Sequence, residues 1–67
     1  MESSDINYYK DKIDEVEKQI YDVQHSTQET FWDDKNREYT KDGYIEWLWN
    51  VIDEYERKIE DLEDRQN

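Results

Sequence analysis

Two runs of apolar residues, spaced alternately three and four positions apart, constrain the fold of this chain more than any other feature. The first run consists of Ile6, Tyr9, Ile13, Val16, Ile20 and Val23. The second run consists of Ile45, Leu48, Ile52, Tyr55, Ile59 and Leu62. A repeat that averages 3.5 residues places its members on one face of an α-helix, as in the seam of a coiled coil. The runs therefore predict two amphipathic helices, at about residues 5–29 and about residues 38–65.

The segment between the two runs is polar at the seam positions. Extending the first repeat places Asp34 and Lys41 on the seam, so a single uninterrupted coiled coil is disfavoured. We expect instead an all-α antiparallel two-helix coiled-coil hairpin, in one domain of residues 1–67 with a connection at about 30–37. If residues whose numbers sum to 68 face each other, the seam has six apolar layers. These layers are Ile6 with Leu62, Tyr9 with Ile59, Ile13 with Tyr55, Val16 with Ile52, Ile20 with Leu48, and Val23 with Ile45.

Short capping signals bear on where these helices begin and end. Ser26 opens the stretch STQE, which resembles a capping box and could begin a separate helix. Asp33 and Asp42 are both candidate N-caps for the second helix. Gly43 lies inside the second helical pattern, where glycine costs about 1 kcal/mol relative to alanine. We expect a long second helix with a weak point at Gly43.

The chain is strongly acidic along its whole length. It carries 20 acidic and nine basic residues, which give a formal net charge of −11. Residues 1–30 contain eight of the acidic side chains, and residues 31–67 contain the other twelve. Such a surface repels phosphates, so direct binding to DNA or RNA is disfavoured. A partner with a basic surface, mimicry of nucleic acid, and a solvated surface that keeps a small protein in solution all remain compatible with the charge.

The sequence offers no catalytic or metal-binding constellation. There is no cysteine, and His25 is the only histidine, so a cysteine nucleophile, a disulfide and a Cys/His zinc site are excluded. The stretch DKNREYTKDGYI, residues 34–45, alternates oxygen ligands at its start as a calcium loop does. It has tyrosine at the sixth place and isoleucine at the twelfth, where such a loop needs glycine and a bidentate acid. We expect a protein that is not an enzyme and that holds no cofactor or metal.

The first ten residues, MESSDINYYK, contain neither an apolar run nor a basic leader. We therefore expect no signal peptide and no membrane span, and a cytoplasmic protein.

The stretch YIEWLWNVI, residues 44–52, carries more apolar surface than one seam requires. On a helical wheel, Tyr44, Trp47 and Val51 form a second stripe beside the seam, and Trp49 lies on the seam's other side. One partner helix cannot cover all of these side chains. In one interpretation, the hairpin core is simply widened by Phe31, Trp32, Tyr39 and Trp49. In the other, a second helix or another chain covers the stripe.

Chain length favours the second of these interpretations. A hairpin of 67 residues buries little apolar surface by itself. We therefore expect a homodimeric four-helix bundle or a hairpin docked on a partner protein. The predicted partner-binding residues are Tyr44, Trp47, Val51, Trp49 and Trp32.

The order of the elements also resembles a known family. A heptad helix, then FWDD, then a second heptad helix resembles the W-x-G helical-hairpin proteins of type VII secretion. Those proteins place a Trp-x-Gly motif in the turn and pair as four-helix dimers. Trp32 corresponds to the tryptophan, whereas Asp34 stands in place of the glycine, and no Tyr-x-x-x-Asp/Glu export motif follows the second run. The resemblance implies dimeric pairing more than it implies secretion.

The sequence thus predicts a non-enzymatic, acidic protein–protein interaction module that self-associates or docks on a partner protein. The alternative is a phage-type inhibitor, of the anti-restriction or anti-CRISPR class, that mimics nucleic acid and binds a DNA- or RNA-binding protein.

Overall fold

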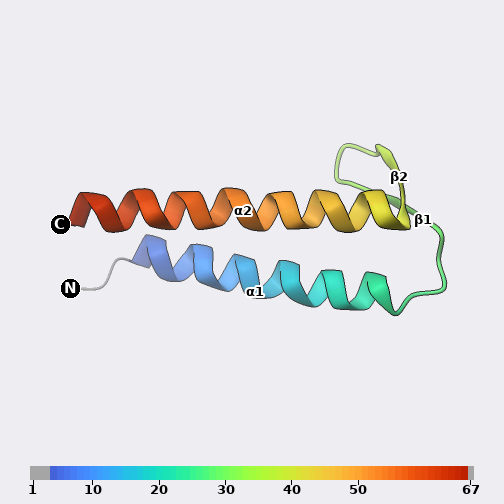
Figure 1. The fold of residues 1–67 in the computed structure, drawn as a ribbon, viewed down its shortest axis with the longest axis horizontal. Helices are drawn as coiled ribbons and strands as arrows, with labels where there is room; N and C mark the ends of the chain where they lie inside the picture. The colour runs from blue at the N-terminus through green and yellow to red at the C-terminus, as the bar shows by residue number, and fades with distance from the viewer. Residues whose placement is uncertain (1–3, 67) are drawn as a thin grey trace.

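The computed structural model describes residues 4–66, which form two long helices and a small sheet. The elements are α1 at Ser4–Gln24, β1 at Thr30–Trp32, β2 at Glu38–Thr40 and α2 at Lys41–Gln66. Helices α1 and α2 run antiparallel and pack against each other, and β1 and β2 lie at the end where the chain turns back (Figure 1). The result is a rod of 45 × 19 × 16 Å. The prediction of two packed helices is confirmed, and the all-α prediction needs correction because a two-stranded sheet is present.

The segment between the helices is longer than predicted, because α1 ends at Gln24 and does not extend to residue 29. The helix closes with a tighter turn, in which the backbone N–H of Ser26 donates to the carbonyl oxygen of Val23 over 3.2 Å. Ser26 begins no second helix, contrary to one of the alternatives. Its hydroxyl oxygen instead accepts a hydrogen bond of 3.0 Å from the backbone N–H of Gln28, a local turn that competes with helix formation.

Helix α2 begins at Lys41, three residues later than predicted, because Thr40 caps it. The Thr40 hydroxyl oxygen accepts a hydrogen bond of 3.1 Å from the backbone N–H of Gly43, the usual bond of an N-cap residue. Gly43 therefore lies in the first turn of an unbroken helix, and neither of the predicted caps, Asp33 and Asp42, has that role. The Lys41 ammonium donates to the carbonyl oxygen of Ser26 over 2.7 Å, which ties the start of α2 to the end of α1.

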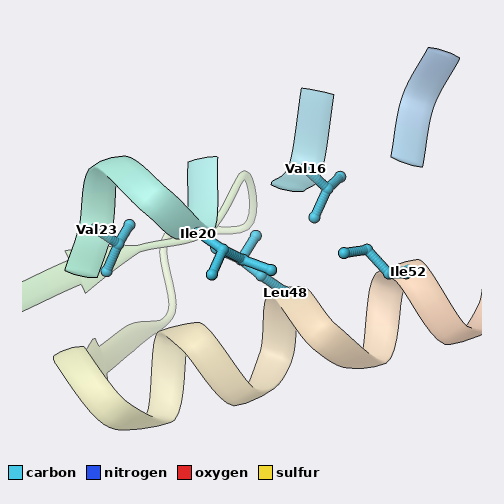
Figure 2. Close-up of a cluster of buried hydrophobic side chains, with 5 residues drawn as sticks. All are labelled: Val16, Ile20, Val23, Leu48 and Ile52. Atoms are coloured by element: carbon cyan, nitrogen blue, oxygen red, sulfur yellow. The ribbon is translucent and has the colours of Figure 1, made fainter. Parts of the chain in front are cut away.

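The hydrophobic core is concentrated at the closed end of the helix pair. Its five buried side chains, from both heptad runs, are Val16, Ile20, Val23, Leu48 and Ile52. Figure 2 shows the α1 residues of this set directed toward those of α2. At the open end, the seam residues Ile6, Tyr9, Ile59 and Leu62 are only half-buried. Packing therefore weakens with distance from the sheet.

Candidate functional site

The two strands form a β-hairpin that lies beside the first turns of α2 (Figure 1). Strand β1 pairs with β2 in antiparallel register, and Phe31 lies opposite Tyr39. The five residues 33–37 connect the strands and contain neither glycine nor proline. Because those two residues dominate tight turns, the hairpin needs another source of turn geometry.

Asp33 supplies most of that geometry. Its side chain is fully buried, and its Oδ1 accepts hydrogen bonds of 2.9 Å from the backbone N–H groups of Lys35 and Arg37. Its Oδ2 accepts a bond of 3.1 Å from Arg37 Nε and one of 2.9 Å from the Tyr39 hydroxyl. Asn36 takes the left-handed conformation, with φ of 66°, which asparagine tolerates better than most residues.

These bonds also set the charge of the loop. The backbone N–H of Arg37 donates to the Asp33 carboxylate and, as the largest effect, lowers the pKa of Asp33 below its ordinary value. The bond from the Tyr39 hydroxyl acts in the same direction, and it raises the pKa of Tyr39, because an ionised tyrosine could no longer donate. Asp33 is therefore a carboxylate that holds the loop together.

The hairpin covers much of the second stripe on α2. The Phe31 ring stacks on Tyr44 with centroids 5.1 Å apart, and the Tyr39 ring lies 5.9 Å from Trp47. Tyr44 and Trp47 also stack on each other, with centroids 5.5 Å apart. Phe31, Tyr44, Trp47 and Val51 all pack against the buried core. The interpretation in which aromatic residues widen the hairpin core is therefore confirmed for Phe31, and Tyr39 extends the same stack.

Two tryptophans do not widen the core. Trp32 and Trp49 are each 50% exposed. Trp32 lies at the end of β1, and Trp49 lies on α2. Four of the five predicted partner-binding residues meet at one groove, and these are Trp32, Tyr44, Trp47 and Val51. Trp49 is the one that does not line it.

This groove, which we call the aromatic groove, lies between α1, the hairpin loop and α2 and has a volume of about 580 Å³. Its lining comprises Val16, Gln19, Trp32, Asp33, Asp34, Tyr44, Trp47, Leu48, Val51, Glu54, Tyr55 and Lys58. The lining combines aromatic and aliphatic side chains with a few charged ones. That combination suits a ligand with an apolar body and a charged group.

Sequence reasoning missed several residues of the groove. Glu54, Tyr55 and Lys58 follow Val51 at three, four and seven positions, so helical spacing could have placed them on the same face. Asp34 carried no such signal, because its position depends on how the loop folds around Asp33.

Across residues 4–66, no group of three or more His, Asp or Glu side chains could hold a metal ion. His25 directly follows α1, where its Nδ1 is 2.9 Å from the carbonyl oxygen of Tyr21 and its ring lies tilted against the Tyr21 ring, with centroids 4.1 Å apart. Within the same span, neither helix is long and apolar enough to cross a membrane.

No protein-family model matches the chain, and neither a curated protein nor a solved structure does. The resemblance to the W-x-G proteins therefore stays a prediction, and Trp32 lies within the segment that connects the two helices. What the aromatic groove can bind has to follow from its own shape and side chains.

Proposed function

We propose that this chain is a non-enzymatic, acidic helical module that binds another protein, either a second copy or a different partner, through the aromatic groove. The observation that carries the proposal is the position of Trp32, which is half exposed at the edge of a groove lined by Trp47 and Val51. Tryptophan is enriched at protein interfaces, where a few buried aromatic anchors supply most of the binding energy. A partner that fills the groove would bury the exposed half of this ring.

The small core supports the same proposal. Within the part of the chain that the structure describes, only five apolar side chains are buried, and all lie toward the closed end of the helix pair. Domains of this size without disulfides or metals commonly gain stability from association. A partner in the groove would cover Tyr44, Trp47 and Val51, which line the groove, are only half-buried and pack against this core.

Trp32→Ser, with Trp49→Ser as its matched control, tests the proposal. Both tryptophans are 50% exposed, but only Trp32 lines the groove. The assays are sedimentation of the pure protein and chemical crosslinking to proteins of the source cell, followed by mass spectrometry. We expect Trp32→Ser to lose the dimer or the crosslinked partner, and Trp49→Ser to keep it. Equal association of both variants and the wild type would contradict a role for the groove.

Folding of the variants has to be verified separately. Trp47 is the poorer choice for substitution, because its ring stacks on Tyr39 and Tyr44 and its loss would disturb the hairpin. Far-UV circular dichroism should show the same helicity for Trp32→Ser, Trp49→Ser and the wild type.

The acidic rod favours a second candidate, an inhibitor that mimics nucleic acid. The molecule is 45 Å long, and a DNA duplex of that length carries about 26 phosphate charges. The chain has 20 acidic residues, and its exposed carboxylates occur on both helices. Neutralising carboxylates outside the groove, such as Asp14→Asn with Glu17→Gln, should then weaken binding to a basic partner as much as Trp32→Ser does. Binding that depends on Trp32 but not on these carboxylates would exclude mimicry.

A further inference from the structure

We infer that the aromatic groove receives an arginine side chain from a basic segment of the partner protein. This inference rests on the proposed function, because it names the chemistry of what enters the same groove. The guanidinium group would stack on the Trp32 ring and approach the carboxylates of Asp34 and Glu54, which line the groove with it.

The aromatic lining suits a planar cation. Four rings line the groove, from Trp32, Tyr44, Trp47 and Tyr55. Aromatic faces attract ammonium and guanidinium groups, tryptophan most strongly, and sets of such rings recognise cationic ligands in many proteins. The same chemistry occurs inside this molecule, where Lys58 Nζ lies 5.9 Å from the centre of the Tyr9 ring.

The charges around the groove favour an incoming cation. Asp33 is occupied by its four hydrogen bonds within the loop, whereas within residues 4–66 neither Asp34 nor Glu54 has an ion-pair partner within 4 Å. Both of these carboxylates are exposed. Lys58 is the only basic residue in the lining described here, and its ammonium lies over Tyr9. A guanidinium group would find two carboxylates without a competing ion pair.

Charge also selects between the candidate occupants. A second copy would bring together two surfaces that each carry a net charge of −11, which opposes close approach. The same negative charge attracts a basic segment toward the groove. Arginine fits better than lysine, because its guanidinium is planar, stacks on aromatic rings, binds carboxylates through two parallel bonds and loses its hydration more easily.

Titration with short peptides, followed by NMR, tests this inference. The probe is a blocked peptide of alanines with two arginines, compared with peptides that carry lysine or the neutral analogue citrulline at those two positions. The protein has three tryptophans, so three indole N–H signals report on binding. The signals of Trp32 and Trp49 are assigned from Trp32→Ser and Trp49→Ser, and the remaining signal belongs to Trp47. We expect the arginine peptide to shift the Trp32 and Trp47 signals saturably and to leave Trp49 almost unchanged. The citrulline peptide should bind at least about tenfold more weakly.

Matched variants separate the groove from the general acidity of the surface. Glu54→Gln and Glu56→Gln each remove one exposed negative charge from α2, but only Glu54 lines the groove. We expect Glu54→Gln and Trp32→Ser to weaken the arginine peptide about fivefold to tenfold, and Glu56→Gln and Trp49→Ser to change it less than about twofold. Circular dichroism and thermal melting of each variant show whether it remains folded.

Three results would overturn the inference. Equal shifts at all three indoles, or equal losses in Glu54→Gln and Glu56→Gln, would mean attraction to the acidic surface at large. Equal affinity for the arginine and citrulline peptides would mean that the positive charge of arginine contributes nothing to binding, because citrulline is neutral. The proposed function has its own readout. If Trp32→Ser abolishes association but the arginine peptide does not enter the groove, the proposed function stands and the arginine inference fails. If Trp32→Ser leaves association intact, the proposed function fails as well.

Discussion

Replacement of Leu48 by alanine tests whether stability resides at the closed end of the helix pair. The Leu48 side chain is only 2% exposed and lies among the buried residues of both helices (Figure 2). Removing three buried carbon groups forfeits about 2.4 kcal/mol of transfer free energy, and the cavity left behind adds to this cost. We expect a total loss of about 3–4 kcal/mol in the free energy of unfolding. The whole domain should have about 3–10 kcal/mol, so the variant would be marginal or unfolded.

Leu62→Ala is the matched control, because Leu62 is the chain's only other leucine and lies in the same helix. The two substitutions therefore change helix propensity equally. Leu62 is half-buried at the open end, where solvent can occupy the space that its side chain leaves. We expect this substitution to cost about 1 kcal/mol, less than half the cost of Leu48→Ala.

Urea unfolding followed by circular dichroism measures both losses. With a denaturant slope of about 1 kcal/mol per molar urea, the two variants should differ in midpoint by about 2–3 M. If Leu48→Ala is already unfolded in water, adding a stabilising osmolyte to all samples restores the comparison. Equal losses in the two variants would refute the unequal packing described above. They would also indicate that something, such as a second copy, covers the open end in solution.

Three further predictions concern the connection between the helices. Acid should loosen the β-hairpin before the helices, because the pKa of Asp33 is lowered in the folded chain. The stabilisation that the Asp33 carboxylate gives is fully present at pH values above its unfolded pKa of about 3.8. It is lost as the pH falls through the lower pKa of the folded state. Near-UV circular dichroism should report this loss, and Asp33→Asn should show the loosened signal even at neutral pH. Thr40→Ala removes the N-cap of α2 and should cost about 1 kcal/mol in urea unfolding, and a cost near zero would mean that the cap bond is not made. Asn36→Gly should be tolerated, whereas Asn36→Val should cost about 1–3 kcal/mol, because a β-branched residue resists a φ of 66°.

The helices could be predicted from the sequence because their signal is local. An alternating spacing of three and four positions places all members of a run on one face of a helix, and the buried residues come from both predicted runs. The helix ends were predicted less well, since Thr40 is one of several polar residues that could have capped α2. Capping residues are common in any polar segment, so they do not fix a boundary without the contacts around them.

The β-hairpin could not be predicted in the same way, because hydrogen bonds and ring stacking of particular side chains hold it, and no regular spacing in the sequence indicates them. Its strands have three residues each, and the loop between them contains neither glycine nor proline, the residues from which a turn is usually predicted. Four hydrogen bonds to Asp33 and the stacking of Phe31 on Tyr44 hold it instead. We predicted that a second helix or another chain covers the aromatic stripe on α2, whereas Phe31 and Tyr39 of the β-hairpin cover part of it.

Because the β-hairpin covers part of the stripe on α2, the surface that is left for a partner is smaller and has a more defined shape. If the stripe were bare, any apolar helix could pack on it, and little selectivity would result. With Phe31 and Tyr39 already stacked on Tyr44 and Trp47, the exposed part narrows to a groove bordered by the loop that Asp33 holds. The loop brings Asp34 to the groove together with Trp32, although α2 supplies most of the apolar lining. Binding should therefore depend on the folded hairpin, and a variant that keeps both helices but loses the loop should lose its partner.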